Sequence, residues 1–452
     1  MRWPFESARA LFEGEIYMNV LLINQYWFAK EWREDGHRVV SIGRYPYLDV
    51  NVPYGISHIN HILGYYLPDF SPDVVVIYDD STPLSIFGLD ELNVPILFYS
   101  VDTHHHFERH RELSEAADKT LIAQSDFLPF FREKDHQVEW FPLWASVEYE
   151  GSVEKELGAC FVGTLNPTLN PRRVDFFNRL QSCVPVTVTT GSFQSIFPKS
   201  HIVINQTVKG DLNFRVFEAM MSGSLLLTEA TGNGLHELFK EGEVLVTYTP
   251  DDHKDAAEKI AFFLAHKGRA RSIGEAGRAE ILRAHLPRHR ADVIGNMLST
   301  LQFQGGRHRH LGMMTNHMHL ALSRRALPHV ALRIEALAAA ALALEQAISA
   351  GEQITHTQAA MAVAGCLEYD VLQQSSAGAR LIDQAIEAWP GSPVLGLVRI
   401  WRFMKNGLEG EARVCAAKTF MGEADQICVQ AQQLKALITE MYGESGNSSS
   451  EC

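Results

Sequence analysis

The chain has 452 residues, which exceeds one ordinary domain and suits two or three. Hydrophobic residues make up 46% and charged residues 21%, the proportions of a globular protein in water. The formal net charge of −14 excludes a broad electrostatic surface for nucleic acid. A local basic pocket for a diphosphate is still allowed, because it needs only one or two arginines.

The cysteines and the beginning of the chain indicate the compartment. The six cysteines are scattered and form no CxxC pair, which favours free thiols in a reducing compartment over disulfides or a zinc site. No apolar run approaches the roughly 20 residues that span a bilayer. The first 17 residues carry acids and lack the apolar core of a signal peptide. We therefore expect a cytoplasmic protein that is not transmembrane.

Short apolar runs alternate with helical patterns in residues 1–150. Continuous runs of this kind are what a parallel sheet covered on both faces needs, and strand–helix alternation favours a doubly wound α/β domain. We therefore predict a Rossmann-like domain here, followed by a domain junction over 138–157, where Pro142 and a polar stretch interrupt the alternation. The predicted strands are 19–24, 38–43, 73–79, 94–100 and 119–124.

The same alternation restarts after the predicted junction. Residues 151–304 are therefore predicted to form a second Rossmann-like domain, with a helical stretch at 252–285 covering its sheet. The fold class is α/β, with two Rossmann-like domains facing a cleft. Such a cleft suits a nucleotide-linked donor on one side and an acceptor on the other. The predicted strands are 159–163, 184–190, 201–206, 224–229 and 243–248.

From about residue 305 the strands stop and Ala, Leu, Gln and Glu dominate. The histidines between 307 and 319 are interpreted as linker residues. Residues 305–445 are predicted to form an all-α domain of successive amphipathic helices. The turn "AIEAWPGSP" resembles that of a tetratricopeptide-type helix pair, although the period is not clean. Residues 446–452 are predicted to be a disordered tail.

Two charged residues stand near the start of a helix predicted after strand 201–206. Arg215 lies near the helix N-terminus, where free N–H groups favour a phosphate, and its planar fork can bridge a diphosphate. Glu218 lies one turn further along the same face, where its carboxylate can accept hydrogen bonds from both ribose hydroxyls. The alternative is an Arg–Glu surface pair worth a few tenths of a kcal/mol.

A histidine-rich loop, "VDTHHHFERH", follows strand 94–100 and should emerge at the carboxyl edge of the first sheet, facing the cleft. Transfer to a hydroxyl is helped by a base. Asp102 could act as this base, or could orient His105 or His106 in that role. The consecutive histidines could instead bind a metal, or form a polar loop. Asp79 and Asp80 are weaker candidates, since Asp is common where strands end.

The second predicted domain carries a family resemblance. The stretches "ACFVGTLNPTLNPRR", "IVINQT", "DLNFRVFEAMMSG" and "IGEAGRAEILRAHLPRHR" stand in this order between about 158 and 300. They resemble the donor-binding domain of GT-B glycosyltransferases, specifically the CgeB-like (spore-maturation) group. The resemblance extends more loosely over 19–302, through "YSVDTHHHFERH" and "VEWFPLWAS". Its most specific element is the run R-x-x-E-A-x-x-x-G.

The resemblance implies a glycosyltransferase that moves a sugar from a nucleotide-diphosphate sugar to a hydroxyl. Because stacks of helical repeats present polypeptides, the helical domain could present a polypeptide acceptor. The acceptor would be a protein, surface or flagellar, or else a cell-surface polysaccharide. No cofactor and no metal are implied, and a homo-oligomer is allowed. Arg215 would face the diphosphate and Glu218 would hold the ribose. The other implied donor-binding residues are Gly163, Thr164, Asn205, Thr228, Gly234 and Leu235.

The sequence departs from the family at one position. The first glutamate of the broader motif would fall at Gly210, and Asp211 is the nearest acid. This leaves the donor sugar and the stereochemical outcome open. It also motivates a second hypothesis, a non-catalytic binding module on a degenerate GT-B scaffold. A nucleotide-sugar epimerase is a third hypothesis, although it would not need the helical domain.

Overall fold

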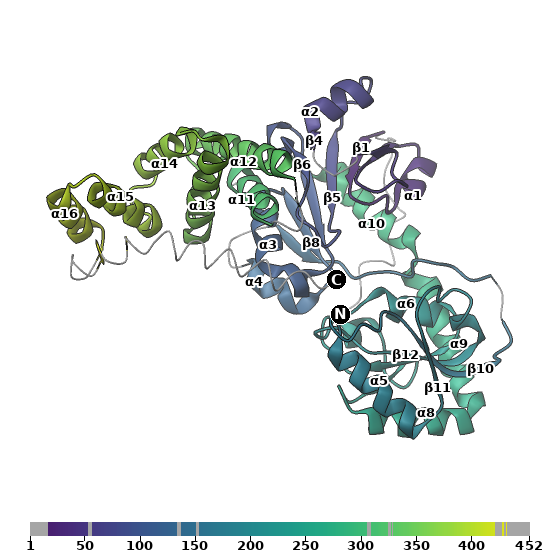
Figure 1. The fold of residues 1–452 in the computed structure, drawn as a ribbon. Coiled ribbons are helices and arrows are strands. Elements are labelled where there is room, and N and C mark those ends of the chain that lie inside the picture. Colours follow the sequence, from purple (N-terminus) through teal and green to yellow (C-terminus); the bar gives the residue numbers. More distant parts are fainter. Residues whose placement is uncertain are drawn as a thin grey trace.

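The structure is a computed structural model that describes residues 17–52, 57–132, 137–150, 153–304, 309–323, 327, 329–420, 427, 428 and 431. Two parallel sheets form separate domains, one above the other in Figure 1, and a row of helices extends from the side of the first. The predicted tail at 446–452 and most of the last predicted helix lie outside the described residues.

The first sheet has seven strands in the order β3-β2-β1-β5-β7-β8-β9. All neighbouring pairs are parallel, as the continuous apolar runs predicted. The strands are β1 (Asn19–Ile23), β2 (Arg38–Gly43), β3 (Val50–Asn51), β5 (Val74–Tyr78), β7 (Ile96–Ser100), β8 (Lys119–Ile122) and β9 (Val138–Trp140). A small two-stranded sheet pairs β4 (Ser57–His58) with β6 (Ile86–Phe87).

Helices cover both faces of the first sheet. One face packs on α1 (Ala29–Glu34) and α10 (Pro287–Thr300), and the other on α3 (Thr103–Glu115) and α11 (Arg309–Leu322). Short helices complete the domain: α2 (Ile59–His61), a π-helical turn (Ile62–Tyr66), 3₁₀ turns (Leu89–Glu91 and Ser125–Phe127) and α4 (Leu128–Arg132).

The second sheet has five parallel strands in the order β11-β10-β12-β13-β14. They are β10 (Leu157–Val162), β11 (Val186–Thr189), β12 (Ser200–Asn205), β13 (Leu225–Glu229) and β14 (Val246–Tyr248). Its helices are α5 (Pro171–Cys183), a 3₁₀ turn (Phe197–Lys199), α6 (Phe214–Met221), α7 (Leu235–Leu238), α8 (His253–Ala265) and α9 (Lys267–Ala284). One face packs on α5 and α8, and the other on α6 and α9.

Helix α10 returns the chain from the second domain to the first. The indole Nε1 of Trp32 in α1 donates to the carbonyl of Ala291 at 3.0 Å. Arg290 is fully buried and donates to the carbonyls of Pro142, Leu143 and Ala284. This arginine therefore anchors the segment between the sheets.

The interpretation of residues 309–319 as a linker is wrong. They form α11, which packs against the first domain through Met313 and Asn316, whose side-chain amide exchanges hydrogen bonds with the backbone of Leu84. Arg309 begins the helix in a buried ion pair with Asp118 at 2.5 Å. The local sequence is polar enough to resemble a linker because His310 and Asn316 find their partners, Asp90 and the backbone of Leu84, in the first domain.

Five further helices continue the row away from the sheets (Figure 1). Ala-rich faces of α12, α13 and α14 bury one another in a core of their own. The helices are α12 (Val330–Ala350), α13 (His356–Gln373), α14 (Ala377–Ala388), α15 (Pro393–Lys405) and α16 (Glu409–Thr419).

Candidate functional site

Helix α6 begins at the carboxyl end of β12 and places Arg215 in its first turn. The guanidinium Nε donates to the carbonyl of Val162 at 3.1 Å, and Nη1 donates to Oδ1 of Asn205 at 2.8 Å. Asn205 in turn donates to Oγ1 of Thr228 at 3.0 Å. Asn205 and Thr228 are fully buried, so they hold the arginine in place without reaching the pocket themselves.

Arg215 is a partly buried cation whose hydrogen-bond partners are neutral. Burial, followed by the nearby positive charge of Arg173, lowers the pKa of Arg215 to about 10. Within the described part of the chain, its hydrogen bonds go to a carbonyl and an amide, and its Nη2 group has no acceptor. A buried charge usually has an ionic partner, so this arrangement favours an anionic ligand.

Glu218 follows one turn later on α6. Its Oε1 accepts a hydrogen bond from Ser146 Oγ at 2.5 Å, and only 8% of the residue is exposed. Ser146 belongs to the segment between the two sheets. Burial raises the pKa of Glu218, and the bond from Ser146 opposes that rise. The expected alternative, an exposed Arg–Glu pair, is therefore wrong, since neither side chain lies on an open helix face.

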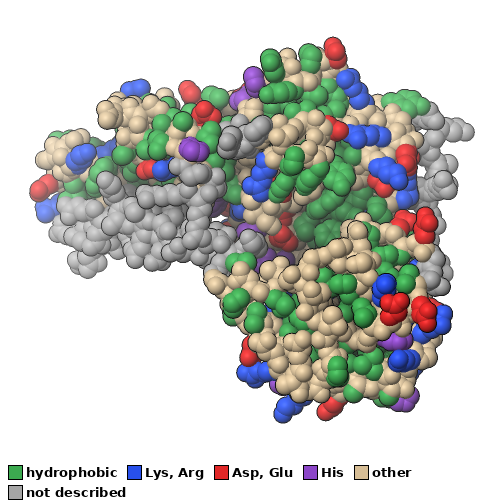
Figure 2. Space-filling model, turned by 45° about the vertical axis from the view of Figure 1, so that its right-hand side comes forward, with side chains coloured by type: hydrophobic (Ala, Val, Ile, Leu, Met, Phe, Trp, Pro, Cys, Tyr) green, Lys and Arg blue, Asp and Glu red, His purple; other side chains and the backbone are tan. Residues whose placement is uncertain are grey.

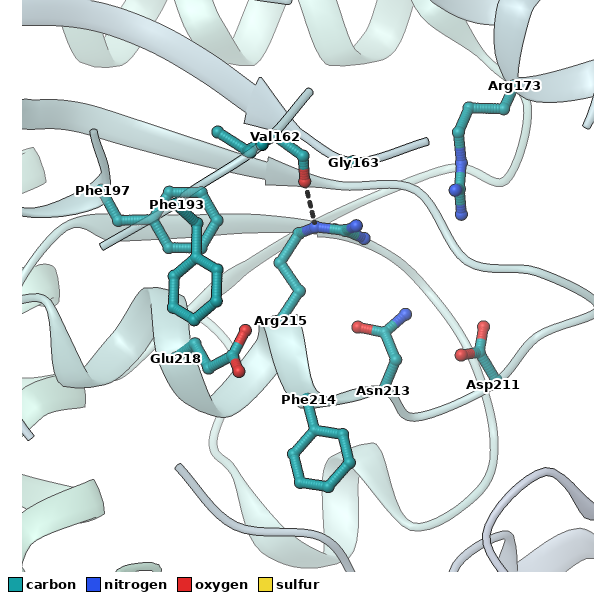
Figure 3. A pocket seen from close by; sticks show the side chains of 11 residues that line it. Val162, Gly163, Arg173, Phe193, Phe197, Asp211, Asn213, Phe214, Arg215 and Glu218 are labelled. Atoms are coloured by element: carbon teal, nitrogen blue, oxygen red, sulfur yellow. Dashed lines mark hydrogen bonds between the residues drawn. The ribbon is translucent and has the colours of Figure 1, made fainter. Parts of the chain in front are cut away.

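Arg215 and Glu218 line one pocket of about 370 Å³. Figure 3 shows both side chains extending from α6 into the same space. Asp211, at the position nearest the family's missing glutamate, also lines it, and burial raises the pKa of this carboxyl. The other lining residues are Val162, Gly163, Arg173, Gly191, Phe193, Phe197, Asn213 and Phe214.

Gly163 lies where only a small residue fits. A Cβ at this position would stand 2.6 Å from Nη2 of Arg215 and close to the ring of Phe161. The glycine therefore leaves room for the guanidinium at the carboxyl end of β10.

Besides Asn205 and Thr228, three implied donor-binding residues do not line this pocket. Thr164 is exposed, and its carbonyl accepts a hydrogen bond from Arg173. Gly234 packs against Trp140 of the first domain, where any side chain would overlap the indole ring. Leu235 is a fully buried core residue. The turn around residue 234 thus joins the two domains, a role that sequence spacing did not indicate.

Asn213 is a pocket residue that sequence reasoning missed. It stands at the N-cap position of α6, but its side chain makes no capping hydrogen bond. Its Oδ1 atom is buried and has no donor among the described residues. An Asn directly before a predicted helix would normally be assigned to capping, which is why the sequence did not single it out.

The histidine-rich segment begins α3 at the carboxyl edge of the first sheet. Asp102 precedes the helix and accepts a hydrogen bond from Ser81 Oγ. His105 is half-buried, and its pKa is lowered by burial and by the charges of His104 and Lys209. Lys209 belongs to the loop before α6, so His105 lies within electrostatic range of the second domain. His106 sits at a kink in α3, and burial lowers its pKa to about 3.

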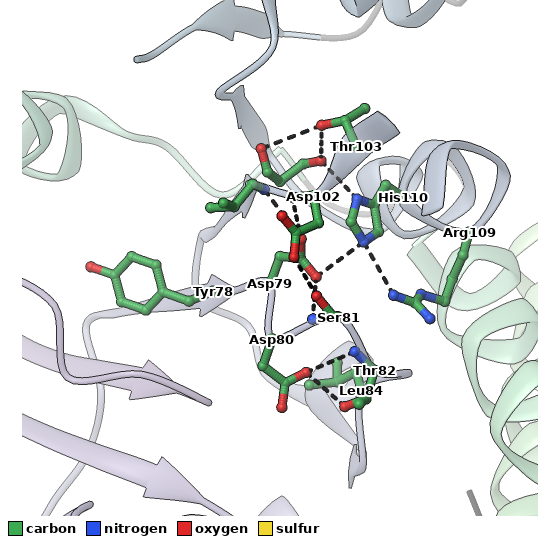
Figure 4. A network of polar contacts seen from close by, with 12 residues as sticks. Tyr78, Asp79, Asp80, Ser81, Thr82, Leu84, Asp102, Thr103, Arg109 and His110 are labelled. Carbon is green, nitrogen blue, oxygen red and sulfur yellow. Dashed lines mark hydrogen bonds and ion pairs between the residues drawn. The ribbon is translucent and has the colours of Figure 1, made fainter. Parts of the chain in front are cut away.

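Asp79 proves to be the structural centre of this edge (Figure 4). Its carboxylate accepts hydrogen bonds from the backbone N–H groups of Ser81 and Asp102, at 2.8 and 2.7 Å. It also pairs with Nε2 of the buried His110 at 3.2 Å. His110, together with the other hydrogen bonds, holds the pKa of Asp79 well below its usual range. Asp79 therefore fixes the position of Asp102, and its own oxygens are occupied.

The two domains meet directly beside the pocket. The side chain of Gln124, after β8, exchanges hydrogen bonds with the backbone of Leu212. Asp126 and Asn233 exchange backbone-to-side-chain hydrogen bonds at 3.1 and 3.0 Å. The loops at the carboxyl edges of both sheets are consequently in contact, and the residues that line the pocket come from the second domain. Figure 2 shows hydrophobic side chains gathered in the recess between the two domains.

Residues 184–296 match the family model described as "Glycosyl transferase-like". The match includes Arg215, Glu218 and the whole of α6, although it covers less than half of the chain. No match was found among curated proteins.

Several solved structures are similar at low identity. A glycosyltransferase from Rickettsia africae is 11% identical with a TM-score of 0.47, over 63% of this chain and 98% of the other. Sucrose-phosphate synthase from Thermosynechococcus elongatus is 12% identical with a TM-score of 0.48, over 63% and 99%. Anabaena HepE, in complex with UDP-glucose, is 12% identical with a TM-score of 0.46, over 63% and 100%. These values are too low to assign an activity to this chain.

In the described ranges, His, Cys, Asp and Glu side chains form no group of three or more that could hold a metal ion. None of the helices in that part of the chain combines the length and apolar character needed to cross a bilayer.

Proposed function

We propose that the protein is a glycosyltransferase that moves a sugar from a nucleotide-diphosphate sugar to a hydroxyl acceptor. The observation that carries this proposal is the pairing of Arg215 and Glu218 in one pocket of the second domain. Arg215 is partly buried and its hydrogen bonds go to neutral groups, and Glu218 is a buried carboxylate one turn further along the same helix. Both lie within the segment that matches the glycosyl transferase-like model.

The pocket contains the groups that departure of a nucleoside diphosphate requires. Negative charge develops on the diphosphate as the sugar leaves, and donors fixed in advance stabilise it most effectively. The free Nη2 of Arg215 and the N–H groups at the start of α6 supply such donors, so the reaction is proposed to proceed without a metal or another cofactor. Glu218 would accept the ribose hydroxyls through the oxygen that Ser146 leaves free.

The first domain would supply the base. Its candidates remain Asp102, His105 and His106. His105 is the best placed, because it lies within electrostatic range of the second domain and its lowered pKa keeps the imidazole neutral at pH 7. His106 is more buried and its pKa of about 3 makes it a poor proton acceptor. Asp102, held by the backbone contact to Asp79, would orient the substrate or the neighbouring histidine.

The proposal extends to a cytoplasmic enzyme whose acceptor is a polypeptide or a glycan. A test of the helical domain must spare α11, because removing it would uncover the first sheet and the carboxylate of Asp118. A chain ending after α11 would still expose the face of α11 that packs on α12. Surface substitutions on α13 to α16 are therefore the better test of acceptor presentation.

Incubation with radiolabelled UDP-, GDP- and dTDP-sugars tests the activity directly. Hydrolysis or transfer of one donor is the expected result. Binding without turnover would instead support a non-catalytic module, and release of a different nucleotide sugar would support an epimerase. Failure to bind any of the three nucleotides would contradict the proposal as a whole.

A further inference from the structure

A cluster of three tyrosines at the carboxyl edge of the first sheet is used neither by the core nor by the proposed donor pocket. Tyr26 follows β1, and Tyr45 and Tyr47 follow β2. The rings of Tyr45 and Tyr47 stack with centroids 5.3 Å apart and an interplanar angle of 6°. Tyr26 meets Tyr47 edge to face at 5.4 Å. Tyr26 and Tyr47 remain 54% and 53% exposed, which is unusual for rings that are already ordered by contact.

The surroundings of this tyrosine cluster are polar and fixed. Arg44 donates to Tyr45 Oη at 3.0 Å and pairs with Asp80 at 3.3 Å. The Asp80 side chain is only 2% exposed, so its buried carboxylate fixes the position of the Arg44 guanidinium. Gln25 lies beside the Tyr47 hydroxyl at 3.3 Å. The cluster therefore presents exposed aromatic surface with hydroxyl, amide and guanidinium groups around it.

The cluster also continues into the candidate active site. Trp27, next to Tyr26 in the chain, contacts Phe214 of the donor pocket with ring centroids 6.0 Å apart. Asp80 is adjacent to Asp79, which holds Asp102. A molecule seated on the tyrosines would thus extend toward the groups proposed to transfer the sugar.

We propose that Tyr26, Tyr45 and Tyr47 form a binding platform for a glycan acceptor. This inference rests on the proposed glycosyl transfer and names its acceptor class. The face of an aromatic ring carries partial negative charge, so it attracts the weakly positive C–H face of a pyranose. The hydroxyls around a sugar match the donors and acceptors of Arg44 and Gln25, which lie beside the rings. A polypeptide segment would gain most from apolar pockets or an open sheet edge, whereas the exposed rings here are surrounded by hydroxyl, amide and guanidinium groups.

Saturation-transfer NMR on the full chain tests the platform. The probes are the methyl glycosides of glucose, galactose, mannose and N-acetylglucosamine, and two Ser/Thr-rich peptides, each with and without bound nucleotide. We expect transfer to the ring protons of at least one glycoside. Its affinity should fall fivefold or more in Tyr47→Ala and in Tyr26→Ala, and stay within twofold of wild type in Tyr47→Phe.

Tyr65→Ala is the matched control, since Tyr65 is 72% exposed on the same domain but lies outside the cluster. Absence of transfer to all four glycosides, or equal affinity in Tyr47→Ala, would overturn the platform. Tyrosine-dependent binding of the peptides alone would overturn the glycan assignment in favour of a polypeptide. These outcomes are independent of nucleotide binding, so failure of the platform is distinguishable from failure of the proposed transferase.

Discussion

Replacing Glu218 with Gln tests whether its carboxylate binds a ligand or only supports the structure. The substitution keeps the shape and leaves an oxygen to accept the hydrogen bond of Ser146. Hydrogen bonds to a charged acceptor exceed those to a neutral one by about 1 kcal/mol each. Two ribose hydroxyls would therefore lose about 2 kcal/mol in total, which corresponds to an approximately 30-fold weaker Kd for the nucleotide.

The stability of the free protein should change in the opposite direction. Burial raises the pKa of Glu218 above its ordinary value of 4.5. The ionised side chain therefore reduces the free energy of unfolding, an effect that develops as pH rises through 4.5 and is complete above the folded pKa. Glu218→Gln removes this cost, so at pH 7 it should melt at the same temperature as wild type or higher. The difference should vanish below pH 4.5.

Calorimetric titration with UDP, GDP and dTDP measures the affinity, and thermal unfolding at pH 7 and at acidic pH measures the stability. Glu237→Gln is the control, because Glu237 is exposed on α7 of the same domain. Unchanged affinity together with a lower melting temperature would refute the reasoning. Glu218 would then be a structural partner of Ser146 and Arg215.

Three other predictions follow from named contacts. Arg215→Lys keeps the positive charge but loses the planar guanidinium, so a nucleoside diphosphate should bind about tenfold more weakly in titration, corresponding to about 1.5 kcal/mol. An unchanged Kd would show that Arg215 does not bind the diphosphate. In Gly234→Ala the new methyl group would overlap Trp140, and the backbone φ of 87° is unfavourable for alanine. The free energy of unfolding, measured in urea, should therefore fall by about 1–3 kcal/mol. The fall should be smaller in Gly242→Ala, where φ is 78° but the space around the residue is open. Burial lowers the pKa of His317 in α11 from 6.5 to about 4, so stability should fall as the pH drops from 6.5 toward 4, and His317→Gln should flatten this dependence in thermal unfolding. An equal slope in that variant would mean that His317 is not a buried neutral group.

The amino-acid sequence determined the elements and their order. Each predicted strand lies on an observed one, because a run such as 94–100 has enough apolar residues to be buried on both faces wherever it pairs. The start of α6 and its end before Gly223, which has a φ of 70°, were likewise local properties of the chain. Helix α13 matches the amphipathic stretch at 356–373. Arg215 and Glu218 could be chosen from the sequence because their spacing on a helix fixes their common face.

The tertiary structure decided which distant residues meet. Ser146 contacts Glu218 across 72 positions, and Arg309 contacts Asp118 across 191. The predicted junction at 138–157 begins with β9, an edge strand of the first sheet. The pairing of Asp79 with His110 depends on two strands ending at the same edge. Local periodicity in the sequence does not predict such contacts, because they form only when the sheets and helices pack together.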